Sequence, residues 1–239
     1  MRRPPEASGL IAHLLNHLFP SRCPVCDSAT DTVRCAPLCR SCWSSIKRYA
    51  GPSCSRCGVP FASRDAHTCS ACILHPPPFS KTLSYGLYEA SLAEAINAFK
   101  FKGVRRLHRP LGDLLLSLDP GGADALVPVP LSLEGLRLRG FNQSLLLAHR
   151  VSRKRGIALV MDGLVKVRDT HPQIGLSARE RAANLKGAFR AERDFSGKRV
   201  ALVDDVMTTG ATAAACSRQL LKAGAADVVV LTLARAGNP

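Results

Sequence analysis

The chain has 239 residues, of which 46% are hydrophobic and 21% are charged, and this composition excludes wholesale disorder and collagen-like structure. Lys and Arg outnumber Asp and Glu by 33 to 18, for a formal net charge of +15. This charge favours a polyanionic partner, such as nucleic acid, a phosphate-rich small molecule or an acidic membrane surface. No apolar run approaches the roughly 20 residues of a membrane-spanning helix, so we expect no transmembrane segment.

Residues 1–20 superficially resemble a signal peptide, because two arginines precede the apolar stretch 9–19. Polar residues interrupt this stretch, however, and no small-residue cleavage site follows it. We therefore expect a cytoplasmic protein. The spacing predicts a short amphipathic helix packed on the body of the protein, with membrane attachment as the alternative. Its apolar face consists of Leu10, Ile11, Leu14, Leu15 and Leu18.

Residues 21–75 hold nine of the ten cysteines, and Cys216 is the tenth. Eight of the nine form four C-x-x-C pairs, each of which can grip one edge of a metal ion. Two pairs complete a tetrahedral site, so the segment is predicted to be a double zinc-ribbon module with two structural Zn²⁺ ions. The simplest pairing is sequential, and a crossed pairing uses the same ligands. The ligands are Cys23, Cys26, Cys39, Cys42, Cys54, Cys57, Cys69 and Cys72.

Other interpretations of the cysteines remain open at this point. Disulfides would require an oxidising compartment, and an iron–sulfur cluster uses the same ligand type. Cys35 is either a spare buried thiol or a substitute for a neighbouring ligand, and His67 and His75 are alternative ligands. Zinc with four protein ligands is structural and performs no chemistry.

After a proline-rich linker at 76–78, the pattern changes to alternating helices and strands, which predicts an α/β domain over residues 80–239 with a mostly parallel sheet. A capping box at Ser91 and Glu94 predicts a helix start, followed by basic residues Lys100, Lys102, Arg105 and Arg106. Residues 168–184 are polar and arginine-rich, as in a long mobile loop. The predicted helices cover 111–118, 142–156 and 211–223, and the predicted strands cover 125–129, 157–161, 164–167, 200–203 and 228–233.

The most specific segment follows the aliphatic strand at 200–203. Two adjacent carboxylates, Asp204 and Asp205, end the strand, and a turn rich in hydroxyl groups then opens a helix. Such a turn presents backbone N–H groups and a positive helix end to a phosphate. The carboxylates can accept hydrogen bonds from vicinal hydroxyls, so the implied ligand is a sugar 5-phosphate. The alternative is a capped helix N-terminus beside two solvated acids.

This segment closely resembles the 5-phosphoribosyl-1-pyrophosphate (PRPP) binding motif of type I phosphoribosyltransferases. The resemblance implies that Asp204 and Asp205 hold the ribose hydroxyls, and that Mg²⁺ is bound by the pyrophosphate and the sugar. It assigns the 5-phosphate to Met207, Thr208, Thr209, Gly210, Ala211 and Thr212.

Further motifs resemble the ComF family: Val-Pro-Val-Pro at 127–130, Arg-Gly-Phe-Asn-Gln at 139–143, and a Gln-x-Gly-Leu-Ser motif at 173–177. The resemblance implies a type I phosphoribosyltransferase-like parallel sheet with flanking helices, preceded by the small cysteine-rich zinc-ribbon module. It also implies that the 168–184 loop closes over PRPP. Pyrophosphate contacts are expected from Arg139, Arg179 and Arg181, because guanidinium groups match phosphate oxygens. Bracing of the loop by Arg139 and a solvated face for the other two are the alternatives.

The expected function is therefore PRPP binding with phosphoribosyltransferase activity towards an unknown acceptor. No catalytic residue is assigned. The 127–130 loop carries no Lys and little chain follows Leu233, so binding is better supported than any particular transfer. The family is linked to natural competence, which implies single-stranded DNA and competence machinery proteins as partners. The alternative is a nucleic-acid-binding competence factor that uses the PRPP pocket as a sensor.

Overall fold

The computed structural model of the protein describes residues 22–30, 37–62, 67–168 and 183–237. The helix expected over residues 1–20, Cys35, and the two loop arginines Arg179 and Arg181 lie outside these ranges. Within them, no helix is both long enough and apolar enough to cross a membrane.

The core of the protein is a five-stranded sheet in which every neighbouring pair is parallel. The strand order is β1-β7-β6-β2-β3, so the two longest strands lie beside one another in the middle of the sheet. Their aliphatic runs are buried on both faces, as expected for strands that helices cover from two sides. The strands are β1 (Lys81–Leu87), β2 (Ala125–Pro128), β3 (Ala158–Leu159), β6 (Arg199–Met207) and β7 (Asp227–Arg235).

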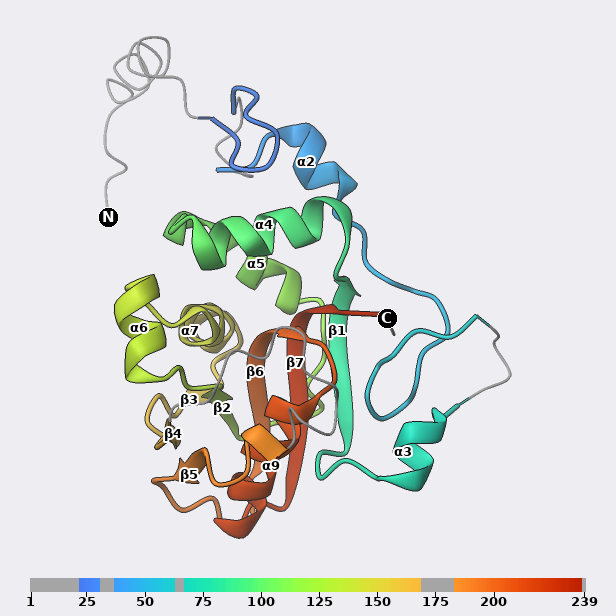
Figure 1. Cartoon of the computed structure of the whole chain (residues 1–239), viewed down its shortest axis with the longest axis vertical. Helices are drawn as coiled ribbons and strands as arrows, with labels where there is room; N and C mark the ends of the chain where they lie inside the picture. Colours follow the sequence, from blue (N-terminus) through green and yellow to red (C-terminus); the bar gives the residue numbers. More distant parts are fainter. Residues whose placement is uncertain (1–21, 31–36, 63–66, 169–182, 238–239) are drawn as a thin grey trace.

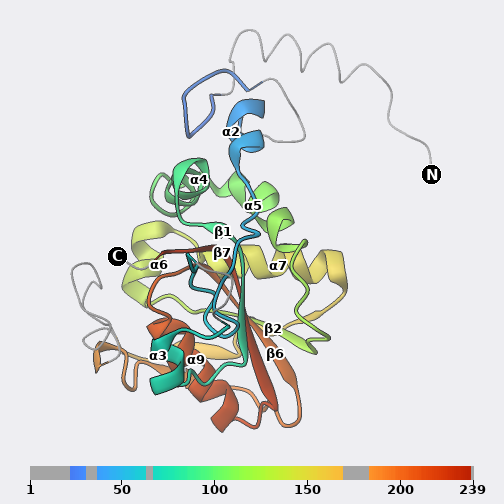
Figure 2. The same cartoon turned by 90° about the vertical axis from the view of Figure 1, so that its right-hand side faces the viewer.

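Helices cover both faces of this sheet (Figures 1 and 2). Alternate residues of β6 belong to two separate hydrophobic clusters: Ala201 and Val203 pack with α4, α5 and α7, whereas Val200 and Leu202 pack with α9. A short helix, α6, follows β2 and has no buried residue. The helices are α4 (Ala90–Phe101), the 3₁₀ turn η1 (Arg105–Leu107), α5 (His108–Leu115), α6 (Leu133–Arg139), α7 (Gln143–Arg155) and α9 (Ala211–Lys222).

The cysteine-rich segment contributes two short helices, α2 (Arg40–Ser45) and α3 (Ser70–Leu74). Figure 1 shows α2 above α4, while α3 lies at the lower right, beyond the edge strand β1. Three of the cysteines before α3 (Cys23, Cys39 and Cys42) pack in the hydrophobic cluster that contains α4, and the cysteines from Cys54 to Cys72 pack in the cluster that contains α9. Each half of the segment therefore supports a different face of the sheet.

The expected fold class, an α/β domain with a parallel sheet and flanking helices after a cysteine-rich module, is confirmed. Two local expectations were wrong. The strand 200–203 continues through both acids to Met207, because β7 pairs with it along its whole length. In addition, α4 has Glu89 as its N-cap rather than a Ser91 capping box. The strand expected at 164–167 is present as β4 (Leu164–Lys166), which pairs antiparallel with β5 (Phe189–Ala191) outside the main sheet.

Candidate functional site

The candidate site lies where the strand order reverses. The chain passes from β2 to β3 on one side and then to β6 on the other side of β2, and open α/β sheets bind ligands at the carboxyl ends of such strands. A cleft of about 550 Å³ opens there. It is lined by both acids of β6, by Val129 and Pro130 after β2, and by residues from four helices, among them Lys100, Phe101, Arg139, Gln143, Ser144 and Thr212.

The two acids have different surroundings, because successive residues of a strand point to opposite faces. Asp205 faces α4, where its Oδ1 lies 2.7 Å from the Lys100 Nζ. Both side chains are nearly enclosed, with 7% of Asp205 and 17% of Lys100 exposed. Burial would lower the pKa of Lys100, but the Asp205 carboxylate outweighs it and raises that pKa. Lys100 is therefore a charged member of the site rather than a free surface cation.

Asp204 is only partly buried and lies beside the turn that follows the strand. Its Oδ1 accepts hydrogen bonds from the Ser144 hydroxyl at 3.0 Å and from the Asp205 backbone N–H at 2.9 Å. Burial, and then the neighbouring Asp205 carboxylate, raise the pKa of Asp204 to about 7, against the opposing effect of Lys100. Two adjacent carboxylates thus share a site with one lysine, which leaves Asp204 poised between its charged and neutral forms.

The turn from Met207 to Thr212, here called the phosphate loop, connects β6 to α9. Gly210 has φ +80°, and a Cβ there would lie 2.6 Å from the Met207 Cε, so both conformation and space favour glycine. The loop ends at the start of a twelve-residue helix. The first turn of such a helix presents backbone N–H groups and the positive end of the helix dipole. Residues 206–213 line a small hollow that Asp204 borders, and this hollow can accept an anion.

The structure places Arg139 in the same cleft, at the end of α6. Its Nη1 donates to the Gln143 Oε1 at 3.4 Å, and its guanidinium lies 5.2 Å from the centre of the Phe101 ring. Gln143 is 1% exposed, and its Nε2 has no hydrogen-bond partner among the described residues. The sequence does not mark Lys100, Gln143 or Ser144 as site residues. The only local signal is Asn142, which predicts that Gln143 and Ser144 begin a helix. The structure confirms this N-cap, because the Asn142 Oδ1 accepts a hydrogen bond from the Leu145 N–H at 3.1 Å.

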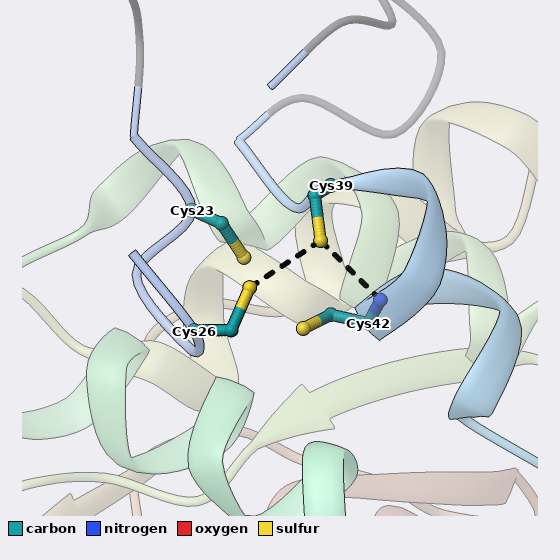
Figure 3. A group of neighbouring side chains, drawn as sticks. All are labelled: Cys23, Cys26, Cys39 and Cys42. Carbon is teal, nitrogen blue, oxygen red and sulfur yellow. Dashed lines mark hydrogen bonds between the residues drawn. The ribbon is translucent and has the colours of Figure 1, made fainter. Parts of the chain in front are cut away.

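The eight cysteines of the four pairs form two groups, and in each group all four sulfur atoms lie within 4.8 Å of one another. The first cluster is Cys23, Cys26, Cys39 and Cys42, and the second is Cys54, Cys57, Cys69 and Cys72. The sequential pairing is therefore confirmed over the crossed one. Figure 3 shows the four side chains of the first cluster converging, with the Cys26 and Cys39 sulfurs 3.5 Å apart.

The chemistry of the clusters fits zinc. Zn–S bonds of about 2.3 Å place tetrahedral sulfurs roughly 3.8 Å apart, and the Cys57 and Cys69 sulfurs are 3.7 Å apart. Hydrogen bonds from Ser28 lower the pKa of Cys26 to about 6. Burial raises the pKa of Cys42 and of Cys72. Four neighbouring thiols lose their protons together only when a cation offsets the negative charge of the four thiolates, and Zn²⁺ supplies this positive charge. Neither His67 nor His75 belongs to a cluster in the described part of the chain.

Comparison with known proteins agrees with both parts of the structure. A family model described as "Double zinc ribbon domain" matches residues 14–73. Competence protein F of Haemophilus influenzae is 36% identical over 210 residues, which cover 83% of this chain and 90% of that protein. The chain belongs to the ComF family. Other ComF relatives are DNA utilization protein YhgH of Escherichia coli, 36% identical over 83% of this chain and 90% of its own length, and Competence protein ComFC of Bacillus subtilis, 29% identical over 83% and 84%.

Solved structures also align with part of this ComF chain. Glutamine PRPP amidotransferase from B. subtilis is 27% identical with a TM-score of 0.38, and the alignment covers 53% of this chain and 26% of that enzyme. A purine phosphoribosyltransferase from Pyrococcus horikoshii is 22% identical with a TM-score of 0.31, covering 57% of this chain and 75% of that one.

Proposed function

We propose that this ComF protein binds PRPP in the cleft at the carboxyl end of β6 and transfers its phosphoribosyl group to an acceptor. The observation that carries the proposal is the direct passage of β6 from two carboxylates into the phosphate loop, at the switch point of the sheet. The residues from Met207 to Thr212 hold the 5-phosphate through backbone N–H groups and threonine hydroxyls. Asp204 and Asp205 accept hydrogen bonds from the ribose hydroxyls.

Lys100 keeps this arrangement electrostatically balanced. Without the ligand, its ammonium group offsets one of the two carboxylates. With the ligand, it holds the Asp205 side chain in a fixed position, where it accepts a hydrogen bond from a ribose hydroxyl. The ribose would therefore meet an acceptor that is already oriented, which reduces the reorganisation that binding requires.

The pyrophosphate end of PRPP lies, in this proposal, towards Arg139, with Arg179 and Arg181 of the 168–184 loop as further contacts. A guanidinium group donates two parallel hydrogen bonds to phosphate oxygens. Mg²⁺ prefers oxygen ligands and is commonly held by one or two carboxylates together with substrate phosphates. The donor set of the cleft fits that mode, since Asp204 is its accessible carboxylate. When bound, Mg²⁺ would offset the negative charge of the departing pyrophosphate.

In the transfer step, the bond between the ribosyl carbon and the pyrophosphate oxygen breaks and an acceptor nucleophile bonds to that carbon. The chain contributes mainly by holding the two ends of PRPP in a fixed geometry and by excluding water. We assign no general base. A cytoplasmic location is part of the same proposal.

Calorimetric titration of PRPP with Mg²⁺ tests this function. The double variant Asp204→Asn, Asp205→Asn keeps the side-chain size but loses two charge-assisted hydrogen bonds, each of about 1.5–3 kcal/mol. Binding should weaken a hundredfold or more while zinc content and fold are retained. Asp119→Asn, which changes an exposed acid remote from the cleft, is the matched control. Wild-type affinity in the double variant would show that the site is elsewhere. A screen of acceptors for pyrophosphate release then tests turnover.

A second function, single-stranded DNA binding, has its own observation. Lys102, Arg105 and Arg106 are exposed and follow closely in the chain on Phe101, which is 67% exposed, lines the cleft and has the Arg139 guanidinium against its ring. Cationic side chains around an exposed aromatic ring suit a phosphate backbone with unstacked bases. In this alternative, the PRPP pocket acts as a sensor, and competence machinery proteins are further partners. Oligonucleotide binding that is undetectable or insensitive to salt would argue against it.

A further inference from the structure

One buried arginine connects the second cysteine cluster to the phosphate loop. Arg235 is the last residue of β7 and is 5% exposed. Its Nε donates to the carbonyl of Cys57, a member of the second cluster, at 2.9 Å. Its Nη1 donates to the Met207 carbonyl at 3.2 Å and also to the Thr208 carbonyl, both in the phosphate loop. A single guanidinium group thus binds both a C-x-x-C pair of the second cysteine cluster and the phosphate loop.

A second residue makes the same connection from β1. The Thr82 backbone N–H donates to the carbonyl of Arg56, which lies between two cysteines of the second cluster, at 2.7 Å. The Thr82 hydroxyl donates to the Met207 Sδ at 3.4 Å. Three members of the second cluster share one hydrophobic cluster with Met207. Three members of the first cysteine cluster pack in the other hydrophobic cluster, which contains α4.

The contacts of Arg235 also set which way the loop peptides face. In a trans peptide, the C=O and the following N–H point in opposite directions. The guanidinium that binds the carbonyls of Met207 and Thr208 therefore directs the N–H groups of Thr208 and Thr209 away from itself. Its buried positive charge lies directly behind the loop, where it attracts an anion on the opposite side.

We propose that Arg235 is a positioning residue that couples the second cysteine cluster to the phosphate loop, so that zinc in this cluster and a sugar phosphate on the loop favour each other's binding. Thermodynamic linkage requires the effect to be reciprocal. The first cluster, with the same chemistry on the other face of the sheet, takes no part. The sugar-phosphate half of this proposal rests on the proposed function, whereas the zinc-to-loop half does not.

The first experiment measures zinc release to a colorimetric chelator with and without ribose 5-phosphate, which carries the phosphate end of the ligand and needs no Mg²⁺. Ribose 5-phosphate should slow the release of one zinc ion at least about fivefold and leave the other unchanged. Cys69→Ser and Cys26→Ser identify which cluster each ion occupies. Arg235→Lys keeps the charge but not the planar fork, and should abolish the slowing. Arg199→Lys, at the start of β6, should retain it.

The second experiment needs no ligand. Hydrogen–deuterium exchange of the 206–213 segment should accelerate at least about fivefold in Cys69→Ser and stay at the wild-type rate in Cys26→Ser. If ribose 5-phosphate does not bind the wild type, the proposed function fails. The coupling between the second cysteine cluster and the phosphate loop is then tested by hydrogen–deuterium exchange alone. Equal exchange in both cysteine variants would overturn the coupling. Bound ribose 5-phosphate without any effect on zinc release would overturn it as well.

Discussion

Replacing Lys100 by Met should destabilise the protein in a pH-dependent way. The change leaves Asp205, which is 7% exposed, beside Asp204 with no cation 2.7 Å away. Breaking a fully buried ion pair by removing one partner costs about 3–5 kcal/mol. Because the Lys100 side chain is partly accessible to water, we expect a smaller loss than this range, about 2–3 kcal/mol at pH 8.5.

The direction of the pH dependence follows from the acids. The pKa of Asp204 is already about 7 in the wild type, and it rises further without the lysine, whose charge lowers it. A carboxyl group with a raised pKa in the folded state lowers stability as pH rises through that value. The loss caused by Lys100→Met should therefore be largest at pH 8.5 and shrink towards pH 5, as Asp204 becomes protonated.

Urea unfolding at pH 5, 7 and 8.5 measures these differences. Adding Asp205→Asn to Lys100→Met should restore most of the loss at pH 8.5, since the unpaired charge is removed. Lys102 is exposed and lies two residues after Lys100, so the control change Lys102→Met should alter stability by less than about 0.5 kcal/mol. A Lys100→Met loss below about 0.5 kcal/mol, or one of equal size at all three pH values, would refute the role given to this ion pair.

Three further predictions concern the ligand, the metal and nucleic acid. PRPP affinity should fall about tenfold between pH 8 and pH 6, as Asp204 loses its charge. Calorimetry of Asp204→Asn should show a smaller fall over the same pH range, because the asparagine does not titrate. The purified protein should carry about two zinc ions, and chelation should unfold residues 21–75 before the α/β domain; elemental analysis that finds no zinc, or stoichiometric iron, would contradict this. Changing Lys102, Arg105 and Arg106 to Gln should lower the salt slope of single-strand binding by about 2 in fluorescence anisotropy; an unchanged slope would place the nucleic acid elsewhere.

The features that the sequence predicts well are those with a local signal. Aliphatic runs predict the buried strands, and Asn142 and Gly156 predict both ends of α7, where the structure has Asn142 as N-cap and Gly156 in the left-handed conformation. The sequential pairing of the cysteines follows from the short stretch of chain between one C-x-x-C pair and the next. In each case, the residues that determine the outcome lie within a few positions of one another or within one small module.

The features that the sequence does not predict depend on distant partners. Ser91 fits a capping box, but its hydroxyl accepts a hydrogen bond from the Ser45 hydroxyl, 46 residues earlier, at 2.7 Å. Lys100 belongs to a run of cations typical of a solvated surface, and only the folded chain brings it to Asp205. Arg235 is the last residue of an aliphatic strand and has no motif around it, so nothing local indicates its contacts with Cys57 and the phosphate loop.

A crystal structure of the complex with PRPP and Mg²⁺ would show directly whether the cleft at the carboxyl end of β6 is the PRPP site. We predict the 5-phosphate within hydrogen-bonding distance of the backbone N–H groups between Thr208 and Thr212, with the ribose hydroxyls at Asp204 and Asp205 and the pyrophosphate towards Arg139. PRPP bound outside this cleft, or bound with its pyrophosphate on the phosphate loop, would contradict this prediction.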